Sequence, residues 1–137
     1  MENALQRTLV LLGANIIMLS RNEIELDKIY DSVKEKYKTK PFIINCDLED
    51  LDENRAQEVA NIIFENYKNL DAVIFNAAVL EKMSDILSYD LKTWDKVIKI
   101  NLTSSFILSK YLISLMESSS NPRICLLYTS DAADDQL

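Results

Sequence analysis

The chain has 137 residues and a formal net charge of −7, with 48% hydrophobic and 27% charged residues. These values indicate one folded domain with its own core and exclude a disordered chain. The acidic charge and the scattered basic residues argue against a nucleic-acid partner, and the lack of histidine excludes a Ser-His-Asp triad and imidazole metal ligands.

The N-terminal part is predicted to hold a helix followed by a strand. Apolar residues recur at helical spacing within residues 3–12, and Gly13, the only glycine, follows where a left-handed helix cap favours it. The apolar run over residues 16–19 is typical of a parallel strand covered on both faces. The apolar stretch from Leu9 to Leu19 is too short to span a membrane and lacks a signal-peptide cleavage pattern. We therefore expect a cytoplasmic protein without a membrane partner.

The middle of the chain alternates between helices and strands. Helical periodicity predicts a helix over residues 26–37 and another through residues 59–67, while apolar runs predict strands over residues 42–44 and 72–75. The connections are short, and each helix is long enough to cross between parallel strands. The predicted fold class is therefore α/β, a doubly wound parallel sheet with helices on both faces.

A long helical pattern begins at about residue 91. Its apolar stripe consists of Trp94, Val97, Ile98, Asn101, Leu102, Ser105, Leu108, Leu112 and Met116. This length exceeds that of an ordinary helix, so we expect a bend or a break within it. Residues 118–122 end the pattern, and residues 123–128 are predicted as one more strand.

Polar residues follow three of the predicted strands. They are Ser20-Arg21-Asn22, Asp47-Leu48 and Asn76-Ala77-Ala78. Because ligands of open parallel sheets bind beyond the carboxyl ends of the strands, we expect these segments to share one rim. The small side chains of Ala77 and Ala78 would let a flat ligand approach the backbone.

The order and spacing of these segments resemble the short-chain dehydrogenase/reductase family. Asn76-Ala77-Ala78 is similar to the Asn-Ala-Gly element after the family's fourth strand, with alanine in place of glycine. Asp47-Leu48 resembles the Asp-Val/Leu pair after the third strand. Asn101, within Lys-Ile-Asn-Leu, resembles the helix asparagine of the catalytic tetrad. The resemblance covers about residues 4–124 and implies a Rossmann-type fold.

The resemblance implies that the strand ends bind a cofactor. Arg21, where an NAD-preferring member would usually carry Asp, resembles the basic residue that pairs with the 2′-phosphate of NADP, so NADP is expected, with NAD possible. Asp47 and Leu48 would contact the adenine ring, and Asn76-Ala77-Ala78 would line the cofactor site. Taken alone, Arg21 is equally a solvated loop arginine, Asp47 a cap or turn residue, and Asn76 a turn former.

Asn101 lies in an apolar stripe, where an amide needs hydrogen-bond partners. In the family the matching residue is catalytic and sits where the helix is disturbed, which frees a backbone carbonyl to hold a water. A local π-bulge would produce this disturbance. The alternative is an amide on the helix surface. Tyr30-Asp-Ser-Val-Lys34 matches the family's Tyr-x-x-x-Lys signature but lies far upstream of Asn76, so we interpret Tyr30 as a packing residue and Lys34 as solvated.

Two parts of the family's reaction centre are not found in the sequence. A dinucleotide pyrophosphate needs a glycine-rich turn at a helix N-terminus, and the only glycine ends a helix. We expect the first strand and this loop to lie before Met1, and the catalytic Tyr and Lys beyond Leu137. Residues 125–135 resemble a translated transposase sequencing adapter. The expected organisation is an incomplete NAD(P)-binding domain over residues 1–124 and a non-native tail over residues 125–137; without the tail the formal charge would be −4 instead of −7.

The resemblance implies that the parent protein is an NAD(P)-dependent oxidoreductase that moves hydride between nicotinamide and a small-molecule carbonyl or secondary alcohol. This chain alone is expected to be inactive. Members of the family commonly pair through the long helix, so a homo-oligomeric parent is expected, and an exposed stripe of Leu108, Leu112 and Met116 predicts aggregation of this chain. The alternative is a noncatalytic α/β binding or interaction module.

Overall fold

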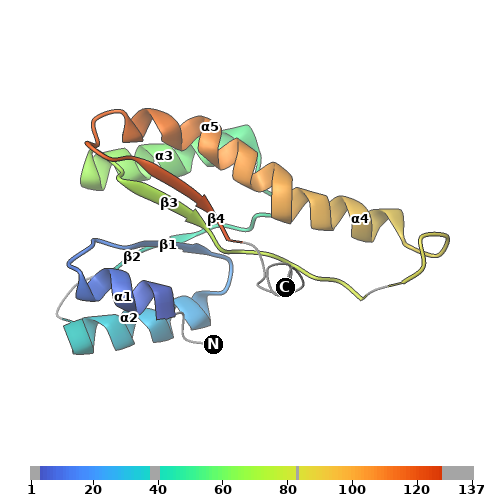
Figure 1. Ribbon diagram of the computed structural model, residues 1–137, viewed down its shortest axis with the longest axis horizontal. Coiled ribbons are helices and arrows are strands. Elements are labelled where there is room, and N and C mark those ends of the chain that lie inside the picture. Colours follow the sequence, from blue (N-terminus) through green and yellow to red (C-terminus); the bar gives the residue numbers. More distant parts are fainter. Residues whose placement is uncertain (1–3, 38–40, 83, 128–137) are drawn as a thin grey trace, which may run out of the picture. The chain divides into compact units, whose positions relative to one another are not determined.

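The computed structural model describes residues 4–37, 41–82 and 84–127 (Figure 1). Its elements are α1 (Ala4–Leu11), β1 (Ile17–Ser20), α2 (Glu23–Tyr37), β2 (Phe42–Asn45), α3 (Glu53–Tyr67), β3 (Ala72–Phe75), α4 (Leu91–Ile98), the π-helical segment η1 (Lys99–Thr103), α5 (Ser104–Met116) and β4 (Arg123–Leu126). The predicted alternation of helices and strands is confirmed. The chain divides into two compact units, Met1–Leu48 and Glu49–Leu137, which we describe one at a time.

The first unit contains a parallel strand pair with two helices. β1 and β2 pair in the register Ile17 with Phe42 through Ser20 with Asn45, so the two strands end side by side. Figure 1 shows α1 and α2 on the same side of this pair. The buried apolar side chains of the unit come from both helices, both strands and the end of β2: Val10, Met18, Leu26, Val33, Ile44 and Cys46.

The end of α1 explains the single glycine of the chain. Gly13 has a φ of +84°, in the left-handed region that favours glycine. The Gly13 N–H donates to the Val10 carbonyl, and the Ala14 N–H donates to the Leu9 carbonyl, both at 3.0 Å. These two bonds form the Schellman arrangement, which satisfies carbonyls that the helix end would otherwise leave unpaired. The predicted cap at Gly13 is confirmed.

The second unit contains the other parallel strand pair, together with α3 and the long helix. β3 and β4 pair from Ala72 with Arg123 to Phe75 with Leu126. β4 therefore crosses the expected boundary after residue 124, while residues 128–137 of the expected tail lie outside the described residues. The Asp52 side chain caps α3 by accepting from the Arg55 N–H at 2.7 Å.

Helix α5 packs against α3 in this unit, and both lie on one side of β3 and β4 (Figure 1). At the N-terminal end of α3, Lys110 Nζ lies 2.6 Å from Glu53 Oε1, a contact that ties the two helices together. The hydrogen bond from Lys110 lowers the pKa of Glu53. None of the helices in the described part of the chain is long and apolar enough to cross a membrane.

The expected exposed stripe on the long helix is wrong. Leu108, Leu112 and Met116 are buried, with 3%, 5% and 3% of their surface exposed, in the unit in which α5 packs against α3. The exposed large apolar residues of η1 and α5 are Leu102, Phe106 and Ile113 instead. Both faces of α5 are apolar, so the spacing alone did not indicate which face α3 covers.

Candidate cofactor and catalytic site

Arg21 and Asp47 meet at the ends of the first strand pair. Since Ser20 pairs with Asn45, the residues that follow the two strands leave the sheet next to each other, and the Cys46 N–H donates to the Ser20 carbonyl at 3.1 Å. The Arg21 Nη1 atom lies 3.2 Å from Asp47 Oδ2. The side chains are 56% and 33% exposed, so this ion pair contributes about 0–1 kcal/mol.

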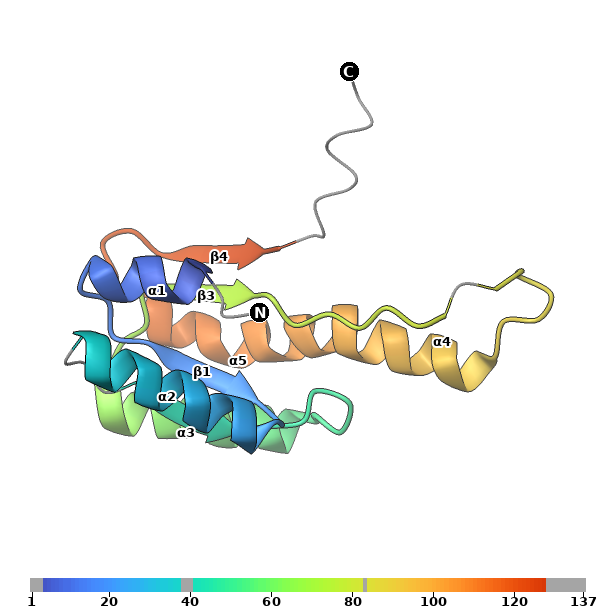
Figure 2. The same cartoon turned by 90° about the horizontal axis from the view of Figure 1, so that it is seen from below.

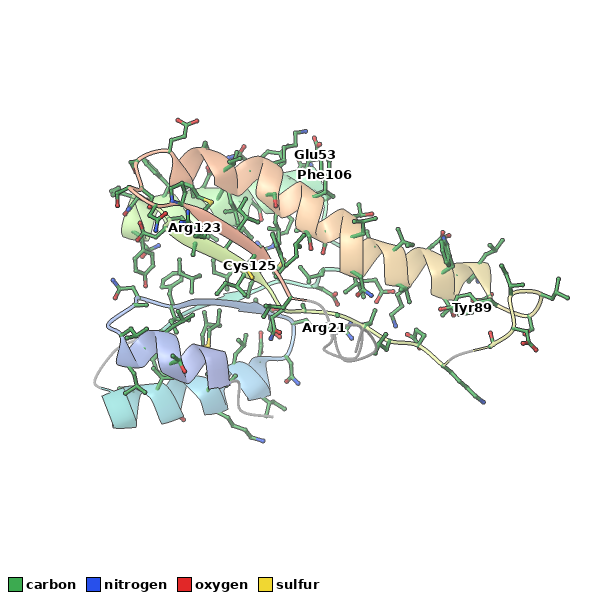
Figure 3. All side chains as sticks on the ribbon, viewed as in Figure 1. Arg21, Glu53, Tyr89, Phe106, Arg123 and Cys125 are labelled. Carbon is green, nitrogen blue, oxygen red and sulfur yellow. The ribbon has the colours of Figure 1, made fainter. Side chains whose placement is uncertain are left out.

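A shallow surface hollow lies at the start of α2, lined by Arg21, Asn22, Glu23 and Ile24. Arg21 is the residue that directly follows the carboxyl end of β1 (Figure 3). A guanidinium in this position fits a phosphate, because its planar fork of donors is permanently charged. The Arg21 side chain is also exposed, so a ligand can reach it from solvent. Leu48 follows Asp47 and is half-buried.

In the second unit, the exposed residues Asn76, Ala77 and Ala78 follow β3 directly. The next residue, Val79, is held by the side chain of Asn101 through two hydrogen bonds. The Val79 N–H donates to Asn101 Oδ1 at 2.8 Å, and Asn101 Nδ2 donates to the Val79 carbonyl at 2.9 Å. The amide predicted to need partners has them, and the alternative of a helix-surface amide is wrong because Asn101 is half-buried in this contact.

Asn101 lies at the centre of the π-helical segment η1, which confirms the predicted disturbance of the helix. Two lysines extend the contacts of this region to neighbouring loops. Lys99 Nζ donates to the Leu51 carbonyl, and Lys96 Nζ lies 3.3 Å from Glu81 Oε1 and 4.0 Å from Glu49 Oε2. Figure 2 shows the chain after β3 running alongside this part of the helix.

The structure thus brings together Arg21 with Asp47 in one unit, and the chain after Asn76-Ala77-Ala78 with Asn101 in the other. The hypothesis that all of these residues face one groove extends across both units and stays a prediction. The roles of the individual residues in cofactor binding and catalysis also stay predictions.

The upstream Tyr-x-x-x-Lys match does not resemble a reaction centre. Tyr30 is half-buried and Lys34 is exposed on α2, with Lys34 Nζ 5.7 Å from the centre of the Tyr30 ring. This is an ordinary contact between neighbours one turn apart on a helix.

Sequence reasoning missed Val79, Lys96 and Lys99. Asn101 bonds to the backbone N–H and carbonyl of Val79, which every residue except proline can provide, so the identity of Val79 carries almost no signal. The two lysines lie among many charged residues of a helix, and only their contacts with loops distant in sequence set them apart.

The comparisons with known proteins agree with this architecture. Residues 3–135 match the family model described as short chain dehydrogenase. The uncharacterized oxidoreductase YciK of Escherichia coli (strain K12) is 28% identical over 124 residues, which are 90% of this chain and 48% of that protein.

Solved structures give the same result. A structure of the oxidoreductase yciK from E. coli superposes with a TM-score of 0.85 at 27% identity, over 98% of this chain and 56% of that chain. A putative short chain dehydrogenase from Shigella flexneri 2a, complexed with NADP, gives a TM-score of 0.80 at 27% identity, over 82% and 47% of the two chains.

The fold is therefore of the α/β Rossmann type, with parallel strand pairs and alternating helices. The chain belongs to the short-chain dehydrogenase family. It spans about half the length of the relatives just named.

Proposed function

We propose that the whole protein is an NADP-dependent oxidoreductase that moves hydride between nicotinamide and a carbonyl or secondary alcohol of a small molecule. The observation that carries the proposal is the doubly bonded Asn101 amide within η1, next to the chain that follows Asn76-Ala77-Ala78. Bound NADP would supply the hydride acceptor or donor. The residues of this chain would bind and orient it.

Asn101 belongs to the catalytic machinery in this proposal, and its side chain and backbone have different tasks. Both polar atoms of the side chain bond to Val79, so the side chain fixes the loop after β3 against η1. The π register leaves the backbone of η1 irregular, and an irregular helix can offer a carbonyl to a water. That water would take part in moving the proton that accompanies hydride transfer.

Arg21 would bind the 2′-phosphate of NADP, and Asp47 with Leu48 would lie along the adenine. The Arg21–Asp47 pair is exposed and weak, so a phosphate with its greater charge can replace the carboxylate as the partner of the guanidinium. The NADP complex of the Shigella flexneri relative supports this choice of cofactor. Asn76, Ala77 and Ala78 would line the path of the nicotinamide half.

Cofactor choice can be tested on this chain with two nucleotides that differ in the 2′-phosphate. We expect adenosine 2′,5′-bisphosphate to bind about tenfold more tightly than 5′-AMP, since the extra phosphate gains charge-assisted hydrogen bonds. Amide shifts in NMR titrations would give both Kd values. The Arg21→Ala variant should remove the difference.

The matched control is Arg55→Ala, which removes a half-buried arginine that also has a carboxylate partner, Glu58, at 2.8 Å. It should keep the tenfold preference. Equal affinity of the unchanged chain for the two nucleotides would contradict the assignment of Arg21.

We further propose that the whole protein is a homo-oligomer that pairs through the outward face of the long helix. This face is defined by Leu102, Phe106 and Ile113, which are 63%, 68% and 56% exposed (Figure 3 labels Phe106). Apolar side chains aligned at helical spacing form a surface that a second copy can bury.

We also propose a cytoplasmic location, because Cys46 and Cys125, both described, form no disulfide.

A further inference from the structure

Ser104, the first residue of α5, is a polar side chain in the core. Only 1% of its surface is exposed. Its hydroxyl donates a hydrogen bond of 2.7 Å to the carbonyl oxygen of Ile100, so the buried group is satisfied. In a regular α-helix the Ile100 carbonyl would accept instead from the backbone N–H of Ser104, four residues further on.

The backbone N–H of Ser104 forms a different hydrogen bond. The Ser104 N–H donates to the Lys99 carbonyl, five residues back, which is the bond of a π-helix. The shift from four to five residues takes the Ser104 N–H away from the Ile100 carbonyl, and the hydroxyl of Ser104 gives this carbonyl a donor from the same residue. Because an unpaired buried carbonyl is costly, the hydroxyl stabilises the π register against the α register.

The register decides where the side chains before Ser104 point. A change from the π to the α register would shift the residues before Ser104 by one position along the helix. Because successive residues of an α-helix are turned by about 100°, η1 and α4 would rotate by about that angle relative to α5. The rotation would carry Asn101 away from Val79 and Lys99 away from the Leu51 carbonyl, which these side chains now hold.

We infer that Ser104 is a positioning residue: its hydroxyl keeps residues 99–103 in the π register that aims Asn101 at Val79. A role of Ser104 in catalysis rests on the proposed function of Asn101. The effect of Ser104 on the helix register does not rest on that proposed function.

Hydrogen-bond couplings in NMR report the register directly, because they identify the carbonyl that accepts from a given N–H. In the unchanged 137-residue chain we expect a coupling from the Ser104 N–H to the Lys99 carbonyl. In Ser104→Ala we expect the coupling to move to Ile100, and the exchange protection of the Val79 N–H to fall about tenfold, as for the loss of one hydrogen bond.

Ser114→Ala is the control, since Ser114 also donates from its hydroxyl within α5, to the Tyr111 carbonyl at 3.4 Å, but is exposed. It should keep the Lys99 coupling. If Ser104→Ala does not fold, the Ser104→Thr variant is measured instead, because it retains a hydroxyl. A coupling from the N–H of residue 104 to the Lys99 carbonyl then supports the inference, and a coupling to the Ile100 carbonyl overturns it.

A Ser104→Ala variant that folds and keeps both the Lys99 coupling and the Val79 protection would overturn the inference, as would an unchanged chain whose Ser104 N–H couples to Ile100. Neither result depends on nucleotide binding. Failure of the inference is thereby distinguishable from failure of the proposed function.

Discussion

Asn101 shows how one side chain can hold two segments that are distant in sequence. An asparagine side chain has an acceptor and a donor at one end, and a residue of extended chain presents an N–H and a carbonyl on its backbone. The pairing of Asn101 with Val79 uses both at 2.8 and 2.9 Å. A leucine would fit the apolar stripe but would leave both backbone groups of Val79 without these bonds.

Replacing Asn101 should therefore destabilise the chain. We expect Asn101→Ala to lower the free energy of unfolding by about 1–3 kcal/mol, because two partly buried backbone groups lose their partner. Urea unfolding of both proteins measures the difference.

Asn66→Ala is the comparison for this change, since the Asn66 side chain bonds to the Ile62 carbonyl on an exposed helix surface. Its cost should stay within about 0.5 kcal/mol. If the two variants are equally stable, the Asn101 contact with Val79 does not hold the loop.

At the scale of elements, the long helix has two apolar faces with different surroundings. One face, with Leu108, Leu112 and Met116, lies in the core of the second unit. The other carries Leu102, Phe106 and Ile113 into solvent. A surface helix with a single partner would normally be polar on its outer side, so the outer apolar face is the place where the proposed pairing of two copies can be tested.

Self-association of the chain should depend on this outer face. We expect Phe106→Glu to shift the chain from self-associated to monomeric in sedimentation velocity, because a second copy would have to bury the new carboxylate. Phe64→Glu places the same charge at another exposed phenylalanine, 50% exposed on α3, and should leave the association unchanged.

Two outcomes would contradict the proposed interface. One is an unchanged chain that sediments as a monomer at high concentration. The other is a Phe106→Glu variant that associates as strongly as the unchanged chain.

At the scale of the whole molecule, the strand pairing fits the doubly wound order. In the sheet order 3-2-1-4-5-6, the second strand pairs with the third, and the fourth with the fifth. The described strands pair in this way if β1 to β4 are strands two to five of that order, since β1 pairs with β2 and β3 with β4. Both pairs are parallel, as this fold requires.

Much of this architecture was predictable from the residues. Ala72–Phe75 is a strand with the predicted bounds, Gly13 caps its helix, and the helix is irregular at Asn101. These features depend on local chemistry: apolar runs, a residue without Cβ, and an amide in an apolar stripe. The predicted strand over residues 16–19 lies one residue further on, at Ile17–Ser20.

What could not be predicted depends on contacts between segments far apart in sequence. The burial of Leu108 in the core of the second unit and the bonding of Asn101 to the Val79 backbone are set by tertiary packing. The strand ends were expected to share one rim, but the direct ion pair between Arg21 and Asp47 was not expected. Periodicity fixes which residues share a face of a helix, but not which neighbour that face receives.

The central proposal is that the residues after the strands of both units bind one and the same dinucleotide molecule. Titration of the isotopically labelled chain with NADPH tests it most directly, with the amides of Arg21 and Asp47 followed together with those of Asn76, Ala77 and Ala78. The account predicts that both groups shift with one and the same Kd. Shifts confined to one unit, or two different Kd values, would contradict it.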